Sequence, residues 1–180
     1  MRNEMEAWAR EVLADPKTAV LDTETTGLHG YVCEISVYEI GGALLDTLVN
    51  PQAPIEPGAQ RIHGLTAEKL ATARPFGEIW PMLESLLADR RIIVWNAEFD
   101  SAVIRREIMR LAEPGTEPPM IELTRRWECA MRNYSDWYWG MPDSRFMKLN
   151  GGHRAAEDCR AVFTRLREMA APSTSAGAPG

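Results

Sequence analysis

The sequence predicts an α/β domain in which helices flank a mixed β-sheet. Two β-rich runs separated by Gly41-Gly42 indicate an antiparallel hairpin in the first third of the chain. Beyond the hairpin, segments whose apolar residues recur at helical spacing alternate with short apolar strands. A hairpin followed by alternating helices and strands is typical of an α/β layer built on a mixed sheet.

Length and composition indicate one globular domain. The 180 residues are 45% hydrophobic and 26% charged, values of an ordinary globular protein. No apolar run approaches the roughly 20 residues of a membrane span, and the N-terminal segment carries acids unlike a signal peptide. We therefore expect a cytoplasmic domain over residues 1–170, and a disordered Pro/Gly/Ser-rich tail over residues 171–180. Cys33, Cys129 and Cys159 lack zinc-ligand spacing and are expected to be free and buried.

The first half of the chain is expected to hold a helix, three strands and a loop. Trp8, Val12 and Leu13 predict a short amphipathic helix over residues 3–14. The strands are predicted at Thr18–Thr23, Tyr31–Ile40 and Ala43–Val49, followed by a Pro-rich loop at Asn50–Gly58. Thr66 is a predicted N-cap of a further short helix.

The second half is expected to alternate helices with strands. Its predicted elements are a helix that buries Ile79, Leu83, Leu86 and Leu87, a strand at Arg91–Trp95, a helix at Ala97–Ala112, a fifth strand at Met120–Thr124, a helix around Arg126–Arg132, a loop at Tyr134–Phe146 and a final helix at Arg154–Met169. A series of this kind is expected to place helices on the faces of the sheet.

Asp22 and Glu24 form the first pattern that carries chemistry. They are two residues apart on a predicted strand, so both side chains leave the same face. Two carboxylates held so close repel each other, and burial favours neither charge unless a cation or a proton lies between them. A solvated strand end that carries turn acids is the structural alternative for this pair.

Asp100, His153 and Asp158 lie where predicted helices begin. A carboxylate in a first helical turn also satisfies the helix dipole, and a histidine before a helix is commonly a cap or a surface residue. Each pattern alone therefore leaves a structural alternative. Together, acids on three strand ends or helix starts can converge on one edge of the sheet, where carboxylate oxygens suit Mg²⁺ or Mn²⁺ better than zinc.

Four motifs in this order resemble the DEDDh 3′→5′ exonucleases, a superfamily that includes the proofreading epsilon subunit of bacterial DNA polymerase III, ribonuclease T and oligoribonuclease. The motifs are LDTETTGL at 21–28, RIHGLT at 61–66, NAEFD at 96–100 and HRAAED at 153–158. The resemblance spans about Ala19 to Met169. It implies a ribonuclease H-like fold, with a mixed five-stranded sheet flanked by helices.

The resemblance also implies roles for individual residues. Asp22, Glu24, Asp100 and Asp158 match the four metal-binding acids, His153 matches the general-base histidine, and Thr25 and His63 match positions that contact the terminal nucleotide. The implied reaction uses two divalent cations, Mg²⁺ or Mn²⁺, and hydrolyses terminal phosphodiester bonds of DNA or RNA to nucleoside 5′-monophosphates. Single-stranded 3′ ends are the expected substrate. An unperturbed histidine pKa of about 6.5 suits a proton acceptor near neutral pH.

Other features concern partners and alternatives. The formal net charge of −6 predicts a small footprint on nucleic acid. A non-catalytic homologue that binds nucleic-acid ends or a partner protein is the alternative function, and the short tail makes polymerase docking doubtful. Trp137, Tyr138 and Trp139 are expected either to stack on bases or to pack under a loop or at the contact of a possible homodimer.

The residues around the last motif carry two more expectations. Arg61 and Arg154 are expected to be solvated arginines beside the motifs. Gly151-Gly152 directly precede His153 and predict a mobile loop that orders when substrate and metals bind.

Overall fold

A five-stranded mixed sheet forms the centre of the molecule, in the order β3-β2-β1-β4-β5. The computed structural model describes residues 1–113, 115, 124–142 and 145–172. The strands are β1 (Thr18–Thr25), β2 (Val32–Glu39), β3 (Gly42–Leu48), β4 (Arg91–Val94) and β5 (Glu128–Cys129). β1, β2 and β3 pair antiparallel, whereas β4 runs parallel to both β1 and β5. The predicted fold class is confirmed.

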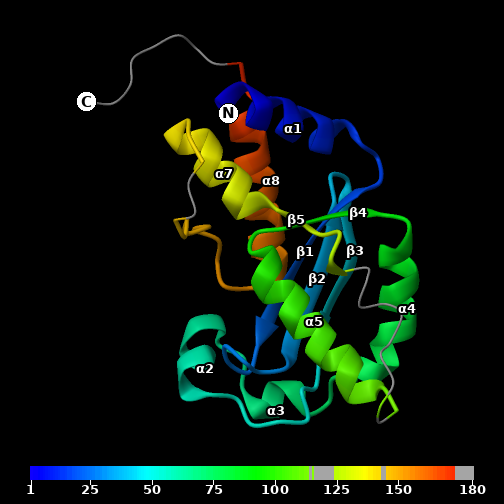
Figure 1. The fold of residues 1–180 in the computed structure, drawn as a ribbon. Coiled ribbons are helices and arrows are strands. Elements are labelled where there is room, and N and C mark those ends of the chain that lie inside the picture. Colours follow the sequence, from blue (N-terminus) through cyan, green and yellow to red (C-terminus); the bar gives the residue numbers. More distant parts are fainter. Residues whose placement is uncertain (114, 116–123, 143–144, 173–180) are drawn as a thin grey trace.

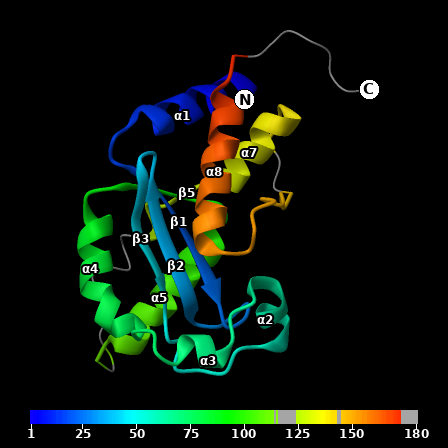
Figure 2. The same ribbon diagram turned by 180° about the vertical axis from the view of Figure 1, so that it is seen from behind.

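Helices cover both faces of this sheet (Figures 1 and 2). One face carries α1 (Arg2–Ala14), α7 (Ala130–Trp139) and α8 (Ala155–Ala170), and the other carries α4 (Phe76–Ala88) and α5 (Ala97–Leu111). Two short helices, α2 (Pro57–His63) and α3 (Ala67–Leu70), lie beyond the carboxyl end of β1. Within the described residues no helix is both long and apolar enough to cross a membrane.

The core has two halves because the side chains of a strand alternate between its faces. On β1, Ala19 and Leu21 join the cluster that packs against α4 and α5, whereas Val20 joins the cluster under α1, α7 and α8. All three are fully buried. This alternation also places Asp22 on the face that Val20 shares with α8.

The N-terminal hairpin follows the predicted pattern. Glu39 pairs with Gly42, so Ile40 and Gly41 form the connection between β2 and β3. Gly42 has a φ of 145°, a conformation that favours glycine. The turn predicted at Gly41-Gly42 is therefore confirmed.

The structure corrects two groups of predicted elements and leaves one predicted strand untested. Residues 57–63 form helix α2, whose Pro57 occupies a first-turn position that tolerates proline, so the Pro-rich loop ends earlier. The strand predicted at Met120–Thr124 falls largely on residues 120–123, which lie outside the described residues, and the strand beside β4 is Glu128–Cys129.

Helix α7 replaces both the helix predicted around Arg126–Arg132 and much of the loop predicted at Tyr134–Phe146. In α7 the buried Ala130 and Tyr134 lie one turn apart on the face toward the core.

The three cysteines are free, as predicted. Cys33 and Cys159 are buried, and Cys159 lies in the cluster under α8. Cys129 is only partly buried, which corrects its expected burial, because β5 is an edge strand. The tail predicted at residues 171–180 lies, from residue 173 on, outside the described residues.

Candidate metal centre

Three carboxylates from two elements meet at the end of β1. Asp22 and Glu24 lie on β1 and Asp158 lies in the first turn of α8, and one carboxylate oxygen from each lies within 4.8 Å of the others. The strand period of two points both β1 acids toward the same face, and α8 packs on that face. The convergence predicted for these three residues is confirmed.

Asp100 reaches the same region from α5. Because β4 runs parallel to β1, the helix that follows β4 begins at the edge of the sheet where β1 ends. Its carboxylate is buried, 2% exposed, and its Oδ1 accepts a 2.9 Å hydrogen bond from the hydroxyl of Thr23. Asp100 is not part of the three-oxygen cluster, but its negative charge raises the pKa of Asp22.

All four carboxylates have raised pKa values, first of all because Asp100 is buried and the other three are partly buried. Burial raises the pKa of Glu24 to about 8 and that of Asp100 to about 7. Burial, with the charge of Asp100 next in importance, raises the pKa of Asp22 well above its usual value, and burial raises that of Asp158. Among the described residues no Lys or Arg forms an ion pair with any of the four.

The cluster fits a hard divalent cation. Oδ1 of Asp158 is buried and has no hydrogen-bond partner among the described residues, which is costly for a carboxylate oxygen. A divalent cation beside it would supply both the missing partner and the missing positive charge. Carboxylate oxygens are the ligands that Mg²⁺ and Mn²⁺ prefer. The donor set therefore matches a divalent metal centre.

His153 lies in a tight loop that precedes α8. Its φ of 55° is left-handed, and the backbone of Gly152 and His153 lies beside the Asp158 carboxylate and acts to lower its pKa, against the larger effect of burial. The imidazole is exposed, and its charge lowers the pKa of Asp158, so the ring lies beside the acidic cluster. A Cβ at Gly151 would overlap Oδ1 of Asp158, which gives this glycine a steric role.

Thr25 and His63 lie together at the end of β1. The Nδ1 atom of His63 accepts a hydrogen bond from the Leu65 backbone at 3.0 Å, so Nε2 carries the proton and donates to the Thr25 carbonyl at 3.1 Å. Burial lowers the pKa of His63, which favours this neutral form. The Thr25 hydroxyl donates to the carbonyl of Gly27 at 2.8 Å. In this arrangement His63 holds the end of β1 in place.

Sequence reasoning missed Thr23, Glu34 and the ion pair that Glu34 makes with Arg154. Thr23 supports Asp100. Glu34 on β2 is 4% exposed and binds the guanidinium of Arg154, whose side chain is 44% exposed, so Arg154 is partly solvated as predicted but is also held by Glu34. An acid within the apolar run of residues 31–40 was the signal for Glu34. A buried acid needs a partner, which points to a nearby arginine.

The three consecutive aromatic residues have different environments on α7. Trp137 packs against the cluster under α8, and the guanidinium of Arg2 lies 5.5 Å from its ring centroid. Tyr138 and Trp139 are 47% and 45% exposed and meet edge to face, with ring centroids 4.9 Å apart. Packing therefore accounts for Trp137, and the other two rings remain accessible at the C-terminal end of the helix.

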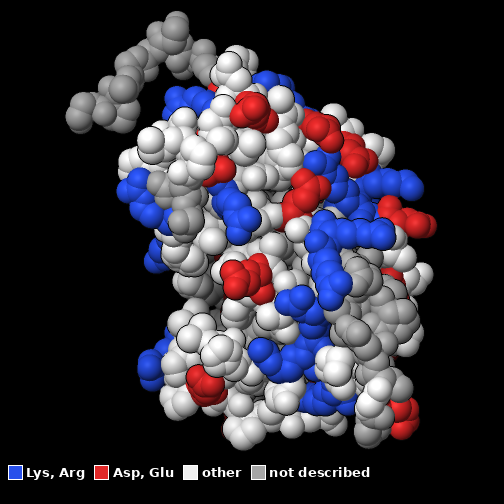
Figure 3. Space-filling view, in the orientation of Figure 1, with Lys and Arg blue, Asp and Glu red and all other residues white. Residues whose placement is uncertain are grey.

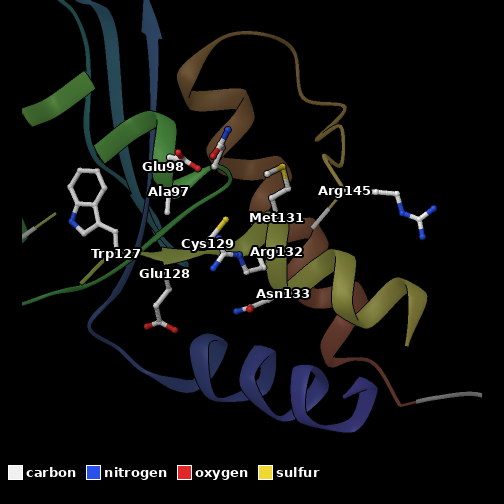
Figure 4. Close-up of a pocket in the computed structure, with 10 residues that line it drawn as sticks. Ala97, Glu98, Trp127, Glu128, Cys129, Met131, Arg132, Asn133 and Arg145 are labelled. Carbon is white, nitrogen blue, oxygen red and sulfur yellow. The ribbon is translucent and has the colours of Figure 1, made fainter. Parts of the chain in front are cut away.

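A cavity of about 490 Å³ lies beside the amino end of α5 (Figure 4). Asn96, Ala97 and Glu98 line one side of it, and β5 and α7 supply residues on the other. The side chain of Glu128 turns away toward α1 (Figure 4), where it accepts a hydrogen bond from Trp8. Neither Asp100 nor any of the three clustered carboxylates lines this cavity, so the candidate metal centre is separate from it.

Charge is unevenly distributed over the surface. Lys and Arg side chains gather over α5 in Figure 3, and acidic side chains lie among and around them. Asp100 lies in the first turn of this helix. The net charge of −6 therefore coexists with basic side chains on the face that carries α5.

Comparison with known sequences identifies relatives over most of the chain. Residues 19–165 match the RNase_T family model, described as exonuclease. An uncharacterised exonuclease, CP81, of Escherichia phage 186 is 31% identical, and the match covers 90% of this chain and 92% of that protein. A PolC-type DNA polymerase III of Thermotoga maritima is 34% identical, and the match covers 86% of this chain but only 12% of the polymerase.

Solved structures show the same fold. Exonuclease I of E. coli, in complex with a dA16 oligonucleotide, has a TM-score of 0.68 at 16% identity, and the match covers 85% of this chain and 42% of that one. Exonuclease X, in complex with 5′ overhanging duplex DNA, has a TM-score of 0.58 at 24% identity, with 84% and 90% of the two chains covered. The family match over residues 19–165 encloses all four carboxylates and His153, and the chain belongs to the RNase_T family of exonucleases.

Proposed function

We propose that this chain is a metal-dependent 3′→5′ exonuclease that releases nucleoside 5′-monophosphates from the 3′ ends of single-stranded DNA or RNA. One observation carries the proposal: Asp22, Glu24 and Asp158 place carboxylate oxygens within 4.8 Å of one another in a chain of an exonuclease family. Acids held so close, with no Lys or Arg ion-paired to them among the described residues, need a cation, and divalent cations serve phosphodiester hydrolysis.

Two divalent cations, Mg²⁺ or Mn²⁺, are the proposed cofactors. Asp22, Glu24 and Asp158 would hold them, with Asp100 as the fourth acid on the side of α5. When bound, the ions supply positive charge that activates the attacking water and stabilises the leaving 3′ oxygen. The protein contributes the rigid arrangement, because both β1 acids lie on a strand at the centre of the sheet.

His153 is the proposed proton acceptor for the attacking water. Its imidazole is exposed beside Asp158, so it can face both solvent and a bound strand end. The backbone of residues 151–153 lies against the Asp158 carboxylate, and this contact fixes the position from which the His153 side chain projects. A base that removes the proton as the water attacks contributes typically about 10²–10⁴-fold to such a rate.

Thr25 and His63 are proposed to shape the place of the terminal nucleotide. His63 uses both ring nitrogens within the protein, so its proposed role is to hold the backbone of Thr25 against the last nucleotide. Two structural neighbours are in complex with a dA16 oligonucleotide and with 5′ overhanging duplex DNA, which supports a strand end as the substrate class. The choice between deoxyribose and ribose depends on contacts to the 2′-hydroxyl.

A degradation assay tests the proposal. DNA and RNA oligomers of equal sequence, labelled at the 5′ end, are incubated with Mn²⁺, with EDTA, and with the Asp22→Asn variant. We expect a ladder that shortens from the 3′ end in Mn²⁺, and no ladder in EDTA or with the variant. The oligomer that is degraded faster identifies the preferred sugar.

Intact oligomers in Mn²⁺ would contradict the proposed activity and favour a homologue that only binds nucleic-acid ends. Retention of the labelled oligomers by the wild-type chain in a filter-binding assay would then support that alternative. A matched control is the Asp46→Asn variant. Asp46 accepts a 2.7 Å hydrogen bond from Ser36 on β2 and is not in the carboxylate cluster, so its variant should keep the Mn²⁺ ladder.

A further inference from the structure

Glu34 and Arg154 form a clamp beside the metal centre, in which the Glu34 side chain is buried and the Arg154 side chain is partly exposed. The Nε atom of Arg154 lies 2.9 Å from Oε2 and 3.2 Å from Oε1 of Glu34, and its Nη2 also donates to Oε1. The same carboxylate accepts a 3.1 Å hydrogen bond from the backbone N–H of Ala155. Ala155 is the first residue of α8, so Glu34 satisfies an amide that the helix itself leaves free.

The clamp joins β2 to α8 next to the acids on β1. In the antiparallel pairing Glu34 lies directly opposite Glu24, so both side chains leave the same face of the sheet. Asp158 follows Ala155 by one turn in the first turn of α8. Glu34 therefore holds the start of the helix that carries Asp158 beside the strand that carries Glu24.

The same clamp holds the loop that carries His153. Arg154 is the N-cap residue of α8 and directly follows His153, so its guanidinium fixes one end of the loop against β2. The loop backbone in turn packs against Asp158, because a Cβ at Gly151 would overlap its Oδ1. A shift of Arg154 would therefore displace both His153 and Asp158, which lies on α8 rather than on β1 with the other two acids of the cluster.

We propose that Glu34 is a positioning residue, which through Arg154 and the amide of Ala155 sets the place of Asp158 and His153 relative to the β1 acids. This proposal rests on the proposed exonuclease function for its catalytic consequences. Groups that orient metal ligands typically cost about 10- to 100-fold in metal affinity or activity when they are removed.

If Glu34 and Arg154 acted only through their charges, one variant would change the Mn²⁺ affinity in the opposite direction. Replacing Arg154 with methionine removes a positive charge from the surroundings of the cluster. If charge alone mattered, Mn²⁺ would bind the Arg154→Met variant more tightly than the wild type. If the clamp positions Asp158, Mn²⁺ binds this variant more weakly, despite the more negative surroundings.

The test combines four variants of the full chain: Glu34→Gln, Arg154→Met, Arg154→Lys and the control Glu128→Gln. Glu128 binds Arg91 with the same two-pronged geometry, at 2.6 and 2.9 Å. Arg91 pairs with Thr18, at the opposite end of β1 from Glu24. The control therefore breaks an equivalent ion pair far from the metal centre. Mn²⁺ binding is measured calorimetrically with the metal alone, and kcat and KM are measured on a single-stranded oligomer.

We expect Glu34→Gln and Arg154→Met to weaken Mn²⁺ binding by about 10-fold or more, and to lower kcat by a similar factor with KM within about two-fold. Arg154→Lys keeps the charge without the planar fork, so it should recover part of the loss. Glu128→Gln should lower the melting temperature without changing Mn²⁺ binding or kcat.

Arg154→Met with wild-type or tighter Mn²⁺ binding and unchanged kcat would overturn the clamp. The side chain of Arg154 is 44% exposed, so its variants are expected to fold even if Glu34→Gln does not. A wild-type chain that binds Mn²⁺ and leaves the oligomer intact would overturn the proposed function alone, because the variants' Mn²⁺ affinities still test the clamp. A wild-type chain that binds no Mn²⁺ would overturn both.

Discussion

The hydroxyl of Thr23 donates a 2.9 Å hydrogen bond to Oδ1 of Asp100, across the sheet from Asp22 and Glu24. Thr23 lies between Asp22 and Glu24 on β1, so its side chain points to the opposite face from theirs. That face carries α5, where Asp100 is 2% exposed. One strand thus places two acids on one face and supports a third acid from the other.

Replacing Thr23 with valine should destabilise the fold, because it leaves a buried carboxylate oxygen without its donor. The expected loss in the free energy of unfolding is about 1–3 kcal/mol, measured by urea denaturation in EDTA. Thr18→Val is the matched control. The hydroxyl of Thr18 is buried on the same strand and makes no hydrogen bond among the described residues, so its removal should leave stability unchanged or slightly higher. Equal losses for both variants would contradict the role given to Thr23.

Gly151→Ala should impair catalysis more than stability. Its Cβ would overlap Oδ1 of Asp158, so either the loop or the carboxylate must move. A displacement of about 1 Å at a reacting site can cost about 10²-fold in rate. We therefore expect kcat to fall by at least about 10-fold, measured on a single-stranded oligomer in Mn²⁺. Gly41→Ala, which would meet nothing closer than 3.7 Å in the hairpin, should keep wild-type kcat. Wild-type kcat for Gly151→Ala would refute this packing argument.

Without metal, the protein should lose stability as pH rises. The pKa of Glu24 is about 8 and that of Asp100 about 7 in the fold, against roughly 4 in an unfolded chain. The folded state therefore holds protons that the unfolded state releases, so this contribution is present below about pH 4 and is lost as pH rises through 7 to 8.

Urea denaturation in EDTA measures this dependence. The free energy of unfolding should fall between about pH 5 and pH 8, and Mn²⁺ should restore part of it at the higher pH by mass action. The free energy of unfolding should therefore decline less with pH in Mn²⁺ than in EDTA. A free energy of unfolding that rises over this range in EDTA would mean that the carboxylates do not share buried, uncompensated charge.

His153→Ala should separate proton transfer from metal binding. Loss of a general base lowers kcat by typically about 10²–10⁴-fold. The imidazole is exposed and is not part of the three-oxygen cluster, so the increase in melting temperature with Mn²⁺ should stay as in the wild type. Asp22→Asn is the companion variant and should lose both the activity and that increase. An active His153→Ala chain would assign proton transfer to another group.

The sequence was sufficient for the fold class and for which acids converge. Asp22 and Glu24 share a face through the strand period, and a helix after a parallel strand brings Asp100 to the same edge; both are local rules. The site was also predictable because its residues lie in motifs at strand ends and helix starts. What the sequence left open was which side chains hold those residues in place.

Glu34, Thr23 and helix α7 show why. The contact between Glu34 and Arg154 joins residues far apart in the chain, so neither local pattern identifies its partner. The orientation of Thr23 follows from the strand period, but its acceptor follows only from the packing of α5 on the sheet. The two-residue strand β5 is too short to have a periodicity of its own, and this shifted the predicted start of α7.

The most direct test of the account uses an oligomer that carries its label in the phosphate of the last linkage, incubated with the wild-type chain and Mn²⁺. The account predicts that the label leaves in the first turnover as a nucleoside 5′-monophosphate, and that none leaves in EDTA. A label that stays on the strand, either while fragments appear from the 5′ end or as a 3′-phosphate on the shortened strand, would contradict a metal-dependent 3′→5′ exonuclease.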